Sequence, residues 1–406
     1  MLQRSSPRLS LAATTLLLAI FVAAPSFGQA TPPYDRTIIV GGSGTDLVNG
    51  TNLLNAITAA LASPTPPSPT NPWLIKVEPG IFDLGSQVLE MQNFLDIEGS
   101  GRNATFIRSD GAAAVQRKTV NVAAGVDAEL RNLTVQYFAT ASGAGVVNES
   151  SELKLTQVNI EVEAAGIVAG IITINSSPRI STVFPRVDST SAISRAFGLR
   201  IQGGAPIVNE MFIFIPNSTN RENVGIFVEN GSAPVLEQIS GVVFGGRNNV
   251  GIRVHAASAR ITNNRWSVST GNDAIGVEIL DSFASEEVGE VEIKESTFES
   301  AGASSSFGLL NRSAGLVVPS VEDSRLDAIL GGGAVAVAVR NTVTGAATHI
   351  DQSKLLGQSA LENAVAGTSF RVGSSKLDGV RIFAAGSSSV CAASYDGAYV
   401  PVPPGC

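Results

Sequence analysis

The stretch Gly225-Ile226-Phe227-Val228-Glu229 is one copy of a pattern that recurs along the chain. A glycine opens each copy, and in most copies apolar residues stand one and three positions after it. Alternation of this kind is typical of a β-strand that buries one face. The pattern therefore predicts one short strand at the same place in each repeat. The copies begin 25 to 32 residues apart, at Gly145, Gly170, Gly198, Gly225, Gly251, Gly276 and Gly308.

A second motif, a polar pair followed by a hydrophobic residue, repeats with a similar period. Its closing residues stand on average 27 residues apart, at positions 107, 135, 160, 187, 213, 242, 266, 298, 326, 355 and 377. A repeat of this length suits three short strands and three turns, whereas a propeller blade needs about forty residues. Because no helical pattern separates the strands, we expect an all-β protein, a right-handed parallel β-helix of about eleven coils. Each strand would pair with its equivalents in the neighbouring coils.

Residues two and four positions after the glycines are expected on the outer face of these strands, as an exposed strip. Stacking in register would place Phe227 between Arg200 and Arg253, and would bring His255 and Glu278 close by. An aromatic face surrounded by polar groups can hold a sugar ring, so these five residues are the predicted ligand-binding site. The predicted partner is a polysaccharide or a cell-surface glycan. The alternative is that the charges form cross-strand pairs that only hold neighbouring strands together.

The N-terminal end of such a β-helix needs a cover, because an open end exposes unpaired strand edges. Apolar residues at helical spacing predict a short amphipathic helix over residues 51–61, with Asn49 or Thr51 as its capping residue. The proline-rich residues 63–72 cannot form a helix or a central strand, so we expect an exposed loop there.

The other end is predicted to close with a disulfide. Cys391 and Cys406 are the two cysteines of the chain, and in an oxidising compartment they would form a bridge that closes the tail. The β-helix domain is therefore expected over residues 31–385, and a C-terminal cap over residues 386–406.

Residues 1–30 are typical of a secretory signal peptide. Arg4 and Arg8 precede a short apolar run, and small residues end the segment at Ala30. Cleavage there would remove both arginines and no acid, leaving 25 basic and 35 acidic residues and a net charge of −10. We therefore expect an exported protein, periplasmic, cell-surface or extracellular, without a membrane span.

Charge and composition argue against several kinds of partner. The chain has 27 basic and 35 acidic residues, and no run of Lys or Arg forms a positive stripe, so a nucleic-acid partner is not expected.

Asp273 is expected to be a turn residue before a strand. We predict neither a metal nor a cofactor, although one acidic cluster could gather Ca²⁺; its spacing matches no calcium loop, and a solvated turn is the favoured interpretation. The cluster consists of Glu286, Glu287, Glu290, Glu292 and Glu295.

Four motifs follow one another near the start of the chain. They are Val-Gly-Gly-Ser-Gly-Thr-Asp at 40–46, Leu-Leu-Asn-Ala-Ile at 53–57, Trp-Leu-Ile-Lys-Val-Glu-Pro-Gly-Ile-Phe at 73–82 and Leu-Asp-Ile-Glu-Gly-Ser-Gly-Arg-Asn-Ala-Thr-Phe-Ile at 95–107. With them, residues 38–107 resemble the opening of pectin-lyase-like right-handed β-helix proteins, particularly the pectin methylesterase branch. The resemblance implies the fold. The catalytic motifs of that branch, Gln-Asp-Thr and Asp-Phe-Ile-Phe-Gly, are absent from this sequence.

The sequence therefore predicts an exported, non-catalytic β-helix protein that presents an elongated surface to a glycan or another protein. The alternative is a polysaccharide lyase, glycoside hydrolase or carbohydrate esterase with an unrecognised active site. Such an enzyme needs two carboxylates, or a carboxylate with Arg or His, that converge in a cleft. The longest repeats, near Phe298 and Gly308, barely exceed the average, so only shallow clefts are expected.

Overall fold

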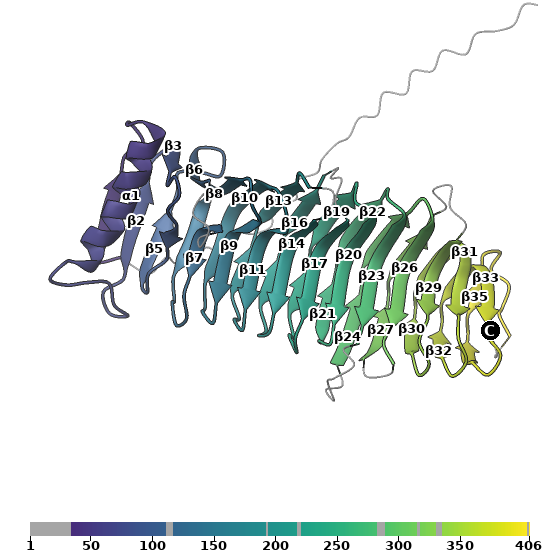
Figure 1. Cartoon of the computed structure of the whole chain (residues 1–406). Helices are drawn as coiled ribbons and strands as arrows, with labels where there is room; N and C mark the ends of the chain where they lie inside the picture. Colours follow the sequence, from purple (N-terminus) through teal and green to yellow (C-terminus); the bar gives the residue numbers. More distant parts are fainter. Residues whose placement is uncertain are drawn as a thin grey trace, which may run out of the picture. The chain divides into compact units, whose positions relative to one another are not determined.

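The computed structural model describes residues 34–110, 117–191, 194–216, 221–281, 289–314, 317–329, 335–403 and 406. Within it, Tyr34–Cys406 form one compact unit. The described strands of this unit build three parallel ladders, named A, B and C here, and the chain visits them in that order in each turn (Figure 1). The predicted fold class, an all-β parallel β-helix of about eleven turns with one helix near the N-terminus, is confirmed. The predicted signal peptide lies outside the described residues.

Ladder A contains the strands that carry the repeated glycines. Each strand pairs in parallel with its equivalent one turn away. Its members are β4 (Leu89–Glu90), β7 (Lys118–Val122), β9 (Gly143–Glu149), β11 (Val168–Ile174), β14 (Arg195–Gln202), β17 (Glu222–Glu229), β20 (Asn248–His255), β23 (Asp273–Leu280), β26 (Ser305–Arg312), β29 (Val335–Asn341), and the second halves of β31 (Lys354–Asn363) and β33 (Lys376–Phe383).

Ladder B follows ladder A in each turn and is mostly made of short strands. Its members are β1 (Arg36–Val40), β2 (Trp73–Val77), β5 (Leu95–Glu98), the first halves of β8 (Glu129–Ala139) and β10 (Lys154–Ala164), β12 (Arg179–Ser181), β15 (Ile207–Asn209), β18 (Val235–Glu237), β21 (Ala259–Thr262), β24 (Gly289–Lys294), β27 (Val317–Glu322), β30 (Ala347–Asp351), β32 (Ser369–Gly373) and β34 (Ser388–Ala392).

Ladder C completes each turn, and four strands that bend at the corner join it to a neighbouring ladder. Its members are β3 (Gly80–Asp83), β6 (Thr105–Ser109), the second halves of β8 and β10, β13 (Phe184–Ser189), β16 (Phe212–Ile215), β19 (Ser240–Phe244), β22 (Arg265–Ser269), β25 (Thr297–Ala301), β28 (Arg325–Ala328), the first halves of β31 and β33, and β35 (Tyr395–Asp396).

The corner between ladders B and C explains the second sequence motif. One residue of the motif in each turn has a positive φ, which bends the chain sharply from one ladder into the next. Left-handed backbone is uncommon for residues other than glycine, and Asn and Asp adopt it most readily. The corner residues are Asn132, Gln157, Thr182, Glu210, Gln238, Asn263, Glu295, Asp323, Gln352, Ser374 and Ala393.

The repeated glycines stand where ladder A approaches other parts of the coil most closely. A Cβ atom on Gly198 would lie 2.7 Å from the carbonyl oxygen of Gly225 in the next turn and would also overlap the side chain of Ile213 in ladder C. The β-carbon of any other residue would therefore force the strands apart. Aliphatic side chains from all three ladders fill the rest of the interior.

Buried polar side chains also form columns along the interior. In the C-terminal half, the backbone N–H of Ser296 donates to Oγ of Ser324 at 3.1 Å, and that of Ser324 donates to Oγ of Ser353 at 3.2 Å. Asn311 and Asn341 are likewise buried, and Nδ2 of Asn311 donates to Oδ1 of Asn341 at 3.1 Å. Because polar groups without water need partners, these columns hold successive turns in register.

The N-terminal helix is longer than predicted. α1 spans Asp46–Leu61, and its N-cap is Thr45, so the expected start at Asn49 or Thr51 is wrong. The apolar residues of the first turn, Leu47 and Val48, are exposed. They therefore do not continue the buried apolar face from which the helix was predicted, and the first turn was missed. Asn49 is buried instead and donates to the carbonyl oxygen of Ile81 at 3.1 Å, which fixes the helix against β3.

The C-terminal end carries the predicted disulfide between Cys391 and Cys406, whose Cα atoms are 5.2 Å apart. Cys391 lies in β34, which still pairs with β32, so ladder B continues beyond residue 385. None of the helices in the described part of the chain has the length and apolar character that a membrane crossing requires.

Candidate functional site

The five residues predicted to bind a ligand lie on the outer face of ladder A, and we call them the strip. Parallel pairing places Arg200 opposite Phe227, Phe227 opposite Arg253, and Arg253 opposite Glu278. His255 pairs with Glu229 in the adjacent row. The predicted stacking order is therefore present in the structure.

Phe227 is the centre of the strip. The guanidinium carbons of Arg200 and Arg253 lie 5.9 Å and 5.8 Å from the centre of its ring. The rings of Phe197 and His255 stack beside it, with centroids at 5.8 Å and 6.5 Å. The ring of Phe227 is thus held by two cations and two aromatic neighbours and remains half-buried.

The arginines of the strip are paired with Glu278 and with two glutamates beside the strip, Glu222 and Glu229. Arg253 lies 2.6 Å from a carboxylate oxygen of Glu278 and 2.8 Å from one of Glu222, and Nε of Arg200 donates to Glu229 at 2.7 Å. Burial alone would lower the pKa of Arg253, but Glu278 and Glu222 outweigh burial and raise it. The strip thus contains the cross-strand ion pairs that were the alternative interpretation.

The expected exposure of the strip is correct only in part. Glu278 and Glu229 point outward but are only 3% and 8% exposed, because long arginine side chains lie across them. An outward position in the strand pattern therefore did not mean an accessible one. Arg200, Phe227, Arg253 and His255 are half-buried.

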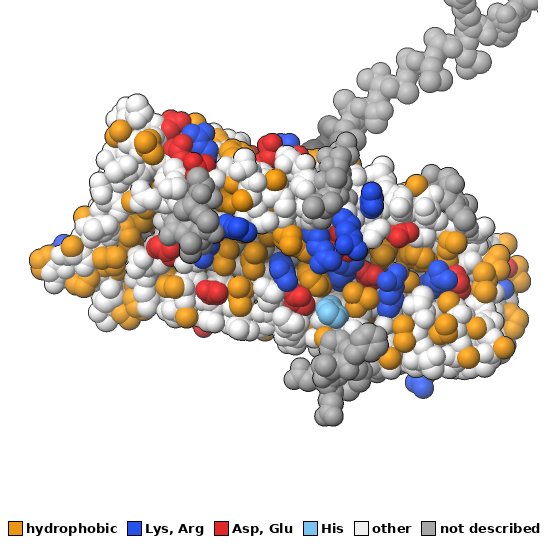
Figure 2. All heavy atoms as spheres, in the orientation of Figure 1, with side chains coloured by type: hydrophobic (Ala, Val, Ile, Leu, Met, Phe, Trp, Pro, Cys, Tyr) orange, Lys and Arg blue, Asp and Glu red, His pale blue; other side chains and the backbone are white. Residues whose placement is uncertain are grey.

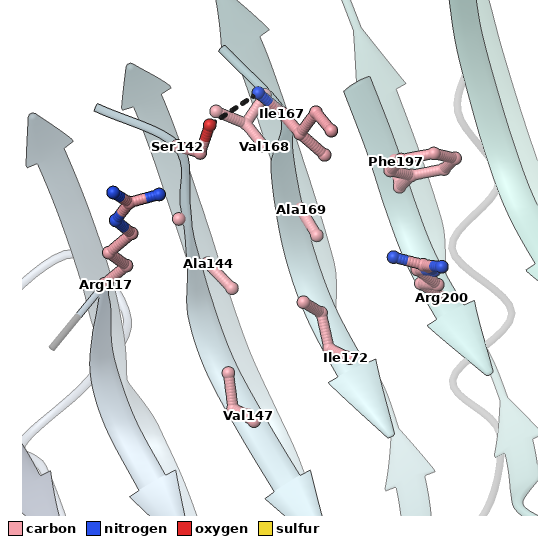
Figure 3. A pocket seen from close by; sticks show the side chains of 11 residues that line it. Arg117, Ser142, Ala144, Val147, Ile167, Val168, Ala169, Ile172, Phe197 and Arg200 are labelled. Carbon is pink, nitrogen blue, oxygen red and sulfur yellow. Dashed lines mark hydrogen bonds between the residues drawn. The ribbon is translucent and has the colours of Figure 1, made fainter. Parts of the chain in front are cut away.

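Beside the strip lies a groove of about 320 Å³, which we call groove A (Figure 3). Its lining is formed by β9, β11 and β14 and is mainly apolar, with Ala144, Ala169 and Phe197 among its side chains. In Figure 3, Arg117 and Arg200 lie at opposite ends of the groove. Groove A therefore offers an apolar surface between two guanidinium groups.

The sequence contained a signal for groove A that the strand pattern did not use. The residue immediately before each repeated glycine is apolar and faces outward, so these residues form a second apolar cluster outside the core. The column consists of Ala144, Ala169, Phe197, Val224, Val250, Ile275 and Phe307, and Val337, which precedes Ala338, continues it in the next turn. These side chains are at most 5% exposed, so the column is a packed layer. The less buried Val147 and Ile172, which pack against it, present apolar surface to groove A.

Arginines gather around this apolar column. Figure 2 shows hydrophobic side chains over β9–β14 and a group of basic side chains over β17–β23. The acidic residues of the ladder A strands from β7 to β26 are Glu149, Glu222, Glu229, Asp273 and Glu278, fewer than the arginines. This face is therefore positive, although the whole chain has a net charge of −8. The arginines in or directly before the ladder A strands from β7 to β26 are Arg117, Arg195, Arg200, Arg221, Arg247, Arg253 and Arg312.

The other sequence candidates do not form a site. Asp273 begins β23 and accepts a hydrogen bond from Ser305 of the next turn, in keeping with a local structural role. Two members of the acidic cluster, Glu286 and Glu287, lie outside the described residues. Among the described residues, His, Cys, Asp and Glu side chains form no group of three that could hold a metal ion.

No family model matches the sequence, and no curated protein matches it. The fold is similar to that of the Dettilon tailspike protein, with a TM-score of 0.51 and 14% identity over 88% of this chain and 68% of that one. The A-module of the Azotobacter vinelandii mannuronan C-5 epimerase AlgE6 matches with a TM-score of 0.45 and 12% identity, covering 87% of this chain and 96% of that one. A GH87 alpha-1,3-glucanase catalytic domain in complex with nigerose matches with a TM-score of 0.47 and 10% identity, covering 93% and 68%. The similarity to the tailspike protein establishes a shared fold alone.

Proposed function

We propose that this chain is an exported, non-catalytic binding protein whose ladder A face holds an extended acidic glycan. The observation that carries the proposal is groove A, an apolar surface with Arg117 and Arg200 at its two ends. Apolar side chains can pack against the C–H faces of sugar rings, while guanidinium groups bind carboxylates or sulfates in a fixed planar geometry. A relation to the pectin methylesterase branch stays a prediction.

The arrangement of carboxylates favours binding over catalysis on this face. A general acid or base must lie within hydrogen-bond reach of the substrate atom with which it exchanges a proton. Glu222, Glu229 and Glu278 instead form ion pairs with Arg253 or Arg200, and Glu229 and Glu278 are only 8% and 3% exposed, so a substrate has little access to them. These glutamates therefore serve to position the arginines.

Calorimetric titration with hexagalacturonate tests the proposal. We expect the wild-type protein to bind and the affinity to fall as salt is raised, because the contact is ionic. Arg117→Ala should weaken binding about tenfold, which corresponds to the roughly 1.4 kcal/mol expected for one charge-assisted contact. Arg117 is exposed, so the fold should be retained.

Arg179→Ala is the matched control, because Arg179 is also exposed but lies in β12 of ladder B. It should bind like the wild type. Equal affinities of Arg117→Ala and wild type, or no binding at all, would contradict the proposed site. Release of shortened or unsaturated products from the hexagalacturonate would contradict the non-catalytic role.

A further inference from the structure

A second groove, here groove C, lies on the outer face of ladder C. Its volume is about 380 Å³, and β10, β13 and β16 supply most of its lining. A smaller pocket of about 100 Å³ adjoins it, since Glu161 and Arg186 line both. Parallel pairing places Glu161 opposite Arg186 and Arg186 opposite Phe214, so the two spaces follow one row of side chains.

Phenylalanine side chains form the apolar part of groove C. Phe184, Phe212 and Phe214 line it, and Phe212 is 39% exposed. Phe214 packs edge-on against Phe244, with ring centroids 5.8 Å apart, and Arg102 lies 4.4 Å from the ring centre of Phe184. Their neighbours hold these rings in place before any ligand arrives. Adjacent aromatic side chains on an outer sheet face mark an interaction site.

Polar groups surround the aromatic rings. Arg102, Asn103, Asn159 and Arg186 line groove C. Arg186 is exposed and forms no ion pair within the described part of the chain. Glu161 accepts a hydrogen bond from Gln136 at 2.8 Å through one carboxylate oxygen, which leaves the other oxygen for a further donor. The groove therefore offers both donors and acceptors next to a flat apolar surface.

The adjoining pocket adds carboxylates to this end of the surface. Glu163 and Asp188 lie opposite each other on β10 and β13 and line the pocket with Glu161. Burial, and then the charge of Glu163, raises the pKa of Asp188. The two spaces together are lined by three carboxylates and by two arginines, Arg102 and Arg186. This excess of negative charge disfavours an anionic ligand, in contrast to the arginine-rich face of ladder A.

We propose that groove C is a second binding site, specific for a neutral saccharide. The rings of Phe212 and Phe214 would pack against the C–H face of a pyranose, while Asn159, Glu161 and Arg186 would bind its hydroxyl groups. The volume of the groove lies within the range of about 300–1,000 Å³ that is usual for small-ligand sites. The chain would thus hold an acidic glycan on one face and an uncharged one on another.

Affinity electrophoresis in gels that contain dextran, laminarin, galactomannan or hydroxyethylcellulose tests the proposal. At least one of these neutral polysaccharides should retard the wild-type protein, and Phe212→Ala and Arg186→Ala should each weaken the retardation at least tenfold. Both side chains are exposed, so we expect unchanged circular dichroism. Tyr399→Ala is the matched control, because Tyr399 is 71% exposed and lies outside groove C.

The outcomes separate this site from the one on ladder A. Phe212→Ala should still bind hexagalacturonate like the wild type, whether or not the ladder A proposal holds for the wild type. No retardation by any of the four polysaccharides, or equal retardation of Phe212→Ala and wild type, would overturn the neutral-saccharide site. So would a wild-type dimer that binds no saccharide and dissociates upon Phe212→Ala, because groove C would then be an interface between copies.

Discussion

At the scale of single residues, ionisable side chains on the outer faces of this molecule fall into two kinds. Arg253 forms ion pairs with Glu222 and Glu278, so its positive charge is neutralised locally. Asp188 has Glu163 opposite it, and its pKa is raised by burial first and by Glu163 second, with Arg186 opposing both. The first kind stabilises the coil, whereas the second places two like charges next to the proposed ligand site in groove C.

The raised pKa of Asp188 predicts a pH-dependent effect of Asp188→Asn. When a carboxyl has a higher pKa in the folded than in the unfolded state, its contribution to stability is present at low pH and is lost as the pH rises through the folded pKa. Asp188→Asn should therefore raise the melting temperature at pH 7 and leave it unchanged near pH 3, where the carboxyl is protonated in both states. A lower melting temperature at pH 7 would contradict the assigned charge repulsion.

The sequence predicted the order of the strip but not its partners. Arg200, Phe227 and Arg253 fall in line because each stands two residues after a repeated glycine. Glu222 stands three residues before Gly225, a position that the alternation analysis did not examine, so its ion pair with Arg253 was not expected. Groove C was missed for a similar reason, since Phe184 and Phe212 are neighbours only across turns of ladder C.

At the scale of the elements, ladder A depends on its glycines for close packing rather than for flexibility. A Cβ atom added to Gly198 would meet the side chain of Ile213 in ladder C and the carbonyl oxygen of Gly225 in the next turn. The periodicity alone identified these strands. It could not identify the reason for glycine, because that reason lies in contacts with residues of another turn and another ladder.

Gly198→Ala should destabilise the protein by about 1–3 kcal/mol, the usual range for an overpacked interior. The added methyl group meets a backbone oxygen at 2.7 Å, so a simple change of rotamer cannot relieve it. Chemical denaturation monitored by circular dichroism measures the effect. Gly41→Ala is the control, because its added Cβ would meet only the side-chain oxygen of Glu78, at 3.3 Å. Equal stability of the two variants would be inconsistent with the close approach.

At the scale of the whole described unit, stability is distributed along a stack in which each turn contacts its neighbours. A protein built in this way unfolds locally before it unfolds as a whole, and its end turns are the most exposed to fraying. The disulfide between Cys391 and Cys406 fastens the last strands, where Val380, Val390 and Tyr399 are exposed. Its effect should therefore be regional.

Replacing both cysteines, Cys391→Ser with Cys406→Ser, should remove about 3 kcal/mol of stabilisation, as expected for a loop of this size. Hydrogen exchange measured by mass spectrometry should show faster exchange in β32, β33 and β34. Exchange in β9 to β20 should stay at the wild-type rate. Faster exchange along the entire stack would show that the turns unfold together and would contradict the regional model.

The serine column has a consequence for how such a chain can change in length. Each amide in the column donates to the hydroxyl of the serine one turn onward, and Ser296, Ser324 and Ser353 are equivalent links. If one complete circuit were excised, the amide before the gap would meet the same kind of acceptor after it. Whole turns can therefore be gained or lost by duplication or deletion while the hydrogen bonds of the serine column are kept. Insertion or deletion of part of a turn would instead move every later donor out of line with its acceptor.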